Sequence, residues 1–188
     1  AASDVYKRQT LTIGLSMTLS TQAHMLWLER ASDAKTHAFF GEYSEQLKET
    51  QEGALKAFSQ AKAIQSKKQF SPQLHQDHLV YSTKDQADVE LYHELIYGES
   101  LLSYHAKSGR QNLKADSELD IVPVQPNSNT FTVMYQGKPA ADVKVTVYSP
   151  QHWLKNYMTN KHGQINIATP WKGQYVLEAV SYTHLRAH

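Results

Sequence analysis

Cysteine is absent from the 188 residues of the chain. The protein can therefore form no disulfide, and an exported protein of this sequence must rely on its hydrophobic core for stability. It also has no thiolate for nucleophilic catalysis or for a soft metal site. Any transition metal must be bound by imidazole, amine, carboxylate or thioether groups, which suits nickel, cobalt, copper(II) or zinc.

Long apolar runs and an excess of one charge are also lacking. An uncharged apolar run covers residues 10–19, about half of the roughly 20 residues that a membrane-spanning helix needs. Lys and Arg together number 19 and Asp and Glu 18, a net charge of +1. A nucleic-acid-binding protein typically carries a strongly basic surface. We therefore expect no membrane span in the mature protein and no nucleic-acid partner.

Familiar catalytic motifs are missing as well. The sequence holds no G-x-S-x-G nucleophile turn, no H-E-x-x-H zinc motif and no glycine-rich phosphate-binding loop. Pairs of acidic residues such as Glu90 and Glu94 resemble an ordinary solvated face. The sequence therefore favours a binding protein over an enzyme.

The apolar run at residues 10–19 has the length of the core of a secretory signal. Small residues follow at Thr21 and Ala23, as a cleavage site requires. Cleavage after Ala23 would make His24 the first residue of an exported, periplasmic protein. Its α-amine, with a pKa near 7.7–8, and its imidazole, near 6.5, would then offer two nitrogen ligands to one metal ion. In the alternative interpretation the cut falls elsewhere and His24 only begins a strand.

The two ends of the chain, residues 1–9 and 180–188, resemble translated sequencing-adapter read-through, and we expect both to be non-native. Residues 10–23 are the expected signal peptide. A polar stretch before residue 118 divides the remaining chain into an N-terminal region, 24–117, and a C-terminal module, 118–179.

Short alternating runs separated by turn residues every 8–12 positions predict an all-β fold. We expect a β-sandwich of the immunoglobulin or transthyretin type in two sub-regions, with one or two helical turns within 44–61. The expected strands are 24–30, 35–43, 61–69, 75–83, 89–97, 101–107, 119–124, 130–136, 143–148, 153–159, 164–168 and 174–179.

Eight of the ten histidines lie between residues 24 and 179, which prompts a search for a metal site. A hairpin turn centred near Asp33 pairs His24 with Glu42, and His37 with Glu29. Cross-strand neighbours lie about 4.5–5.5 Å apart at Cβ. The pattern therefore predicts a site made of the amine and imidazole of His24 with Glu42, and His37 as a weaker member. The alternative is a partly exposed strand histidine.

Other histidines are weaker candidates. A hairpin centred near Glu99 pairs His93 with His105, and these two imidazoles with the amine of His24 would form a compact nitrogen site. The alternative is two surface histidines. His75 and His78 share a face only if they lie in a turn or helix.

The remaining histidines and tryptophans are expected to play no part in a site. His152 and His162 flank one expected strand and have no matched partner, so we expect exposed turn residues. Trp153 and Trp171 are expected in the core rather than in a ligand platform.

The C-terminal module, from Leu119 to Ala179, resembles the transthyretin and carboxypeptidase-regulatory type through its turns at 137–139, 159–163 and 171–173 and the strand 143–148. The whole body resembles an exported family of domains of unknown function, number 4198, through residues 24–28, 40–43, 121–124 and 170–173. That family is grouped with periplasmic components of nickel and cobalt uptake. The resemblance implies an N-terminal nitrogen ligand, which His24 would supply.

The leading hypothesis is an exported β-sandwich protein that binds a divalent transition metal, nickel or cobalt with copper or zinc as alternatives, and delivers it to a membrane uptake transporter. A rival is a non-catalytic module that binds a surface glycan or a partner protein. A third is a copper enzyme that oxidises polysaccharides through an N-terminal histidine. Metal binding that requires a free His24 separates the first hypothesis from the second.

Overall fold

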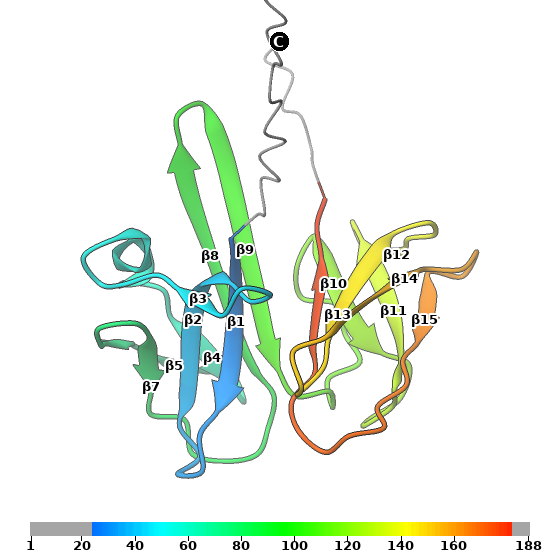
Figure 1. The fold of residues 1–188 in the computed structure, drawn as a ribbon, viewed down its shortest axis with the longest axis horizontal. Helices are drawn as coiled ribbons and strands as arrows, with labels where there is room; N and C mark the ends of the chain where they lie inside the picture. The colour runs from blue at the N-terminus through cyan, green and yellow to red at the C-terminus, as the bar shows by residue number, and fades with distance from the viewer. Residues whose placement is uncertain (1–23, 182–188) are drawn as a thin grey trace, which may run out of the picture.

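The computed structural model describes residues 24–181 of the chain (Figure 1). The expected signal peptide, the N-terminal end and residues 182–188 lie outside the described residues. Within 24–181 the chain forms sixteen strands and one short 3-10 helix, which confirms the all-β class. No helix in this range is long and apolar enough to cross a membrane.

The first half of the described chain, residues 24–108, contains nine strands and the 3-10 helix. Their bounds are β1 Met25–Arg30, β2 Thr36–Glu42, β3 Leu47–Lys48, η1 Ala54–Phe58, β4 Ala63–Gln65, β5 Lys68–Phe70, β6 Gln73–Leu74, β7 Leu79–Tyr81, β8 Val89–Tyr97 and β9 Ser100–Ser108. One antiparallel sheet has the order β1-β2-β7-β6, with β3 also paired to β2, and a second has the order β5-β4-β8-β9.

The second half, residues 119–179, contains seven strands. Their bounds are β10 Leu119–Pro123, β11 Thr130–Tyr135, β12 Lys138–Pro139, β13 Lys144–Tyr148, β14 Leu154–Met158, β15 Gln164–Asn166 and β16 Val176–Ala179. One sheet has the order β10-β11-β12, with β15 also paired to β11, and the other has the order β14-β13-β16.

Each half has its own hydrophobic core. Alternation along β1 turns Leu26 and Leu28 into the first core, where they meet residues from both sheets of that half and also Leu55 and Phe58 of η1. Val133 and Val145 lie at the centre of the second core. Since alternate residues of a strand point to opposite faces, Trp27, which lies between Leu26 and Leu28, points away from the first core.

A third, smaller cluster joins the two halves, which lie side by side in Figure 1. Trp27 of β1 and Phe39 of β2 point away from the first core and pack with Tyr148 of β13 and Val176 of β16. The side-chain amide of Gln174 also donates a hydrogen bond of 3.0 Å to the carbonyl of Leu28. The outer face of the β1–β2 sheet is thus partly covered by the second half.

Two expected strands are divided by turns. The segment 61–69 is a hairpin of β4 and β5, because Ser66 and Lys67 both adopt positive φ angles of 50° and 66°. The segment 75–83 holds the β6–β7 turn and only the short strand Leu79–Tyr81. Neither turn carries the glycine, asparagine or proline that normally marks one. The expected helical turn within 44–61 is present as η1.

Candidate functional site

His24 lies between two carboxylates at the start of the described chain. Its Nε2 is 2.6 Å from Oε1 of Glu49, and its Nδ1 is 3.8 Å from Oε1 of Glu42. The imidazole is 32% exposed, so an ion in solution can reach it. Its ring also packs on Phe40, with 5.3 Å between ring centres.

The strand register explains this arrangement. Met25 of β1 pairs with Gly41 of β2, which brings His24 next to Glu42, as expected from the hairpin. His37 likewise pairs with Glu29. Glu49 was not expected. It follows β3, which folds back along β2, and its backbone N–H donates to the carbonyl of Phe40 at 2.8 Å.

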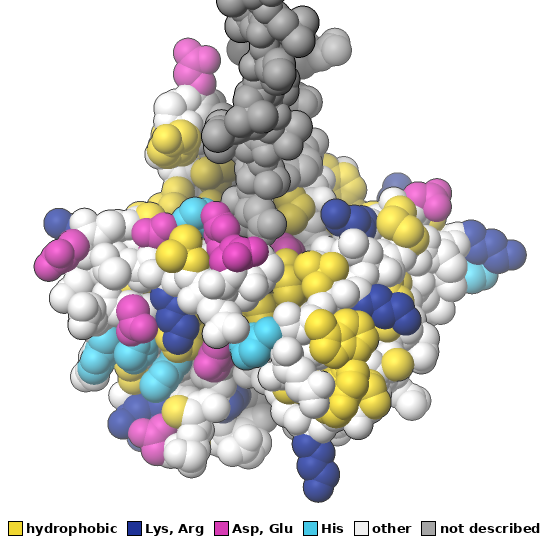
Figure 2. All heavy atoms as spheres, in the orientation of Figure 1, with side chains coloured by type: hydrophobic (Ala, Val, Ile, Leu, Met, Phe, Trp, Pro, Cys, Tyr) yellow, Lys and Arg dark blue, Asp and Glu magenta, His cyan; other side chains and the backbone are white. Residues whose placement is uncertain are grey.

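His37 does not join His24. It lies with Phe39 and His78, and the rings of His37 and His78 are stacked with their centres 4.8 Å apart. Figure 2 shows histidine side chains close together on this half of the molecule. His37 therefore belongs to a different surface from the one that sequence reasoning assigned to it.

His93 and His105 are not a cross-strand pair. In the β8–β9 hairpin, His93 pairs with Tyr104 and Tyr92 pairs with His105. The expected register is wrong by one residue because the turn contains only two residues, Gly98 and Glu99, with Gly98 at φ +60°. A slip of one residue places a side chain on the opposite face of the sheet.

The two histidines therefore have different surroundings. The ring of His93 packs on Phe58, and its Nε2 is 3.0 Å from the carbonyl oxygen of Ala57. His105 Nδ1 is 2.7 Å from the hydroxyl of Ser117. Neither histidine contacts His24. The ring of His24 packs on Phe40, and Phe40 and Phe58 lie between it and His93. The predicted site of these two imidazoles with the amine of His24 does not form in this arrangement.

A network of charged groups surrounds His105. Lys107 Nζ lies 2.6 Å from Oδ2 of Asp120 and 3.8 Å from Oε1 of Glu90, and His105 Nε2 lies 3.8 Å from Oε2 of Glu90. The pKa of Glu90 is lowered to about 2, mainly by its interaction with His105 and further by Lys107 and Asn112. Asp120 is almost fully buried. These pairs attach β8 and β9 to β10, so their role is structural.

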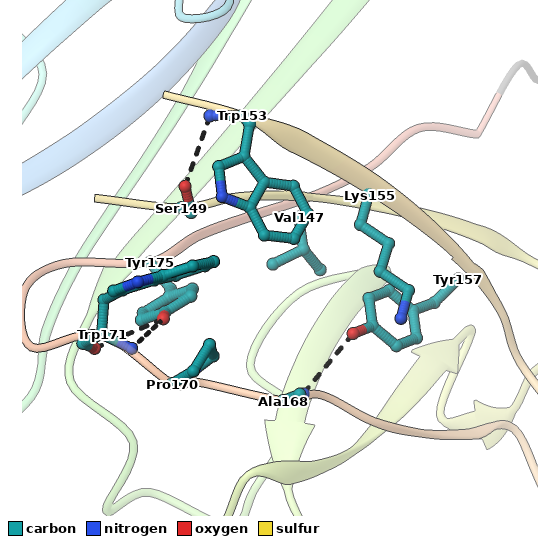
Figure 3. A pocket seen from close by; sticks show the side chains of 9 residues that line it. All are labelled: Val147, Ser149, Trp153, Lys155, Tyr157, Ala168, Pro170, Trp171 and Tyr175. Carbon is teal, nitrogen blue, oxygen red and sulfur yellow. Dashed lines mark hydrogen bonds between the residues drawn. The ribbon is translucent and has the colours of Figure 1, made fainter. Parts of the chain in front are cut away.

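A small aromatic pocket of about 70 Å³ lies in the second half (Figure 3). The indole rings of Trp153 and Trp171 meet edge to face, with centres 5.2 Å apart. Tyr157 and Tyr175 line the pocket as well, and Lys155 lies at its edge with Nζ 4.9 Å from the Tyr157 ring. The expectation that both tryptophans belong to the core is wrong, since Trp153 is 45% exposed and Trp171 is only half-buried.

A wider hollow, of about 370 Å³, lies where the two halves meet. Trp27, Glu29, Tyr43 and Lys48 of the first half line it, and His152 faces them from the second half. His152 and His162 are both exposed, as the sequence predicts.

In residues 24–181, no group of three or more His, Asp or Glu side chains is arranged to hold a metal ion. His24 with Glu42 and Glu49 supplies one imidazole and two carboxylates at unequal distances. A metal ion at this place would need a further donor, and the α-amine of a mature chain beginning at His24 is the one that sequence analysis proposes.

Comparison with known proteins identifies the family. Residues 28–183 match the domain of unknown function DUF4198, so the match begins four residues after His24 and covers most of the chain. No curated protein and no solved structure matches the sequence. Because the match extends through both halves of the fold, the whole described body and not only one sheet pair is a member of the DUF4198 family.

Proposed function

We propose that the protein is exported and binds a divalent transition metal, nickel or cobalt, through His24 for delivery to a membrane uptake transporter. The observation that supports this proposal is the position of His24 between Glu42 and Glu49. Copper(II) and zinc have the same ligand preferences, so the resemblance to nickel and cobalt uptake components guides the choice of metal.

The contact with Glu49 suits a histidine that binds metal through Nδ1. Metal-binding histidines usually donate their second ring N–H to a carboxylate, which fixes the tautomer and the ring orientation. With Nε2 donating to Glu49 at 2.6 Å, the lone pair of Nδ1 is free. Nδ1 and the α-amine belong to one residue and can close a chelate ring around one ion.

Glu42 would supply a third donor. Two atoms that bind one metal ion at about 2.1 Å lie about 3.0–3.4 Å apart. Nδ1 of His24 and Oε1 of Glu42 are 3.8 Å apart, so a small side-chain rotation brings both to one ion. The resulting site would use two nitrogens and one oxygen, leaving positions for water or for a ligand from the transporter.

The finer fold assignment is also a proposal. Each half consists of two antiparallel sheets around one core, which supports a sandwich of the immunoglobulin or transthyretin type divided near residue 118. A metal site at the first residue would then lie at the edge of one sandwich, where a membrane partner can approach it.

The test compares two forms of the protein, one starting at His24 and one carrying a single additional alanine before it. We expect tight nickel or cobalt binding by calorimetry only in the first form, and a loss of about tenfold or more in Glu42→Gln. His162→Ala, an exposed histidine in the second half, is the matched control. Equal binding by both forms, or none in either, would rule out the N-terminal clamp.

The aromatic pocket favours a second candidate function, recognition of a surface glycan. Exposed aromatic rings provide flat apolar faces with polar edges, and Trp153, Trp171 and Lys155 supply such faces with one cation. Under this proposal Trp153→Ala would weaken binding to immobilised polysaccharide at least tenfold, while Trp27→Phe would leave it unchanged. Glycan binding that survives Trp153→Ala would eliminate the pocket as its site.

A further inference from the structure

Three histidines lie in a row across neighbouring strands, on the outer face of the sheet that contains β1 and β2. His37 of β2 pairs with Val80 of β7, and His78 lies two residues before Val80, on the same face of that strand. Across the β6–β7 turn, the backbone N–H of His75 donates to the carbonyl of His78 at 2.9 Å. The register thus brings His37, His78 and His75 side by side.

The distances between the ring centres of these histidines are close to the spacing of adjacent strands. The ring centres of His37 and His78 are 4.8 Å apart and those of His78 and His75 are 5.0 Å apart. Adjacent strands lie about 4.7–4.9 Å apart. The row therefore follows from the β2–β7 pairing and from the turn between β6 and β7, in which His75 and His78 lie.

Asp77 fixes the tautomer of His78, the middle histidine of the row. Its Oδ1 lies 2.7 Å from Nδ1 of His78, and an ionised carboxylate can only accept, so Nδ1 carries the proton of this hydrogen bond. In the neutral ring Nε2 then holds a free lone pair. A carboxylate on one nitrogen and an open lone pair on the other is the usual arrangement of a metal-binding histidine.

The row is accessible, and its charge suits a cation. His75 is exposed and His78 is 22% exposed, while His37 is half-buried. Burial, and after it the neighbouring His78, lowers the pKa of His37 below its ordinary value. Glu29, Asp33 and Asp77 provide negative charge nearby, and Lys48, which lies over Phe39, is the cation that acts on Asp77.

We propose that His37, His75 and His78 form a second binding site for a divalent transition metal ion, with His78 as the central ligand. Two imidazoles that bind one ion through nitrogens at about 2.0–2.1 Å have ring centres roughly 4.5–5.2 Å apart, and both separations in the row fall within this range. The rings are stacked and do not converge on one point. Binding requires them to turn about their side-chain bonds, a motion that takes picoseconds to nanoseconds at a surface.

This site uses no atom of the proposed His24 clamp, so either can exist without the other. The experiment uses the full chain, in which residues precede His24 and its nitrogen is an amide. Zinc chloride and nickel chloride are titrated by calorimetry into the parent and into His24→Ala, His37→Ala, His75→Ala and His78→Ala. His162→Ala again serves as the control, and thermal unfolding followed by circular dichroism verifies that each variant folds.

We expect His78→Ala to weaken binding at least tenfold, His37→Ala and His75→Ala to weaken it severalfold, and His24→Ala and His162→Ala to leave it unchanged. Parent-like affinity in a folded His78→Ala would overturn the proposal, as would a loss confined to His24→Ala. If His78→Ala does not fold, His75→Ala decides, because His75 is exposed in a turn. Unchanged affinity in that variant would then contradict the site.

Discussion

In each of three histidines one ring nitrogen has a hydrogen-bond partner, so only the other ring nitrogen can bind a further ligand. Glu49 occupies Nε2 of His24, Asp77 occupies Nδ1 of His78, and Ser117 lies at Nδ1 of His105. The opposite nitrogen of His24, Nδ1, lies 3.8 Å from Oε1 of Glu42, and the side chain of His78 is 22% exposed. The opposite nitrogen of His105 faces Glu90 inside the charged network. His24 and His78 thus each keep one ring nitrogen for a proposed metal ion, whereas His105 makes structural contacts with both nitrogens.

Glu90 gives a pH-dependent prediction. Its pKa in the folded protein is about 2, below the ordinary value of 4.5, because His105, Lys107 and Asn112 favour the ionised form. The corresponding stabilisation is present above pH 4.5 and is lost as the pH falls towards 2. We expect Glu90→Gln to lower the free energy of unfolding by about 2 kcal/mol at pH 7.

Urea unfolding at several pH values checks this expectation. The difference between parent and Glu90→Gln should shrink as the pH falls from about 5 to 2. Glu99→Gln, in the exposed hairpin turn, should follow the parent throughout. A difference that stays constant over this range would mean that the charge of Glu90 contributes nothing to stability.

At the scale of elements, Gly41 of β2 shows why one backbone position tolerates no side chain. It pairs with Met25 of β1 on one side and with Lys48 of β3 on the other. Its φ angle is +150°, and a Cβ atom there would lie 2.1 Å from the carbonyl oxygen of Leu47. The glycine allows β3 to fold back closely enough for Glu49 to reach His24.

We expect Gly41→Ala to lower the free energy of unfolding by roughly 3 kcal/mol, from backbone strain and the clash with β3. It should also weaken metal binding by a chain beginning at His24, since Glu49 would move. Gly98→Ala is the matched control. Gly98 also has a positive φ, but its surroundings are open, so about 1 kcal/mol is expected. Chemical denaturation measures both, and equal losses would contradict the clash.

Sequence patterns predicted the strands well where a short apolar run is closed by turn residues. The β1–β2 pairing and the contact of His24 with Glu42 follow from the hairpin at Asp33. The β4–β5 turn was missed because Ser66 and Lys67 adopt positive φ without the glycine, asparagine or aspartate that usually takes this conformation. The β8–β9 register was predicted one residue away from the actual one. In the actual register His93 and His105 lie on opposite faces of the sheet, because side chains alternate at every position.

Contacts between distant segments were beyond prediction for a different reason. Glu49 reaches His24 only through the return of β3, and the row of three histidines needs the β2–β7 pairing. The two-residue sequence of β3 is too short to show any period. Trp153 and Trp171 were placed in the core because of their size, whereas their positions beside turns leave them at a pocket.

For the whole molecule, the cluster of Trp27, Phe39, Tyr148 and Val176 determines how firmly the halves are joined. Trp27 is 4% exposed, stacks on Phe39 with ring centres 5.4 Å apart, and meets the edge of Tyr43 at 5.2 Å. Because each half has a separate core, this cluster can weaken while both cores persist.

We expect Trp27→Ala to cost about 3–5 kcal/mol, the usual range for removal of a buried aromatic side chain. It should also make the connection at residues 109–118 more susceptible to proteolysis, because the halves are held less firmly. Trp153→Ala removes the same side chain from an exposed position and should cost well under 1 kcal/mol. Calorimetric unfolding and limited proteolysis measure the two effects. Resistance to protease equal to that of the parent would show that other contacts join the halves.

The β8–β9 hairpin pairs nine residues with nine, from Val89 opposite Ser108 to Tyr97 opposite Ser100, and it projects beyond its sheet in Figure 1. Val89 and Leu91 at its base are fully buried, whereas Ile96 and Tyr97 near the turn are about four-fifths exposed. In deuterated water, the tip should therefore fray and take up label first. Labelling should then advance along both strands towards Val89. The free energies of opening measured along this one hairpin should therefore range from those of local fraying to that of global unfolding.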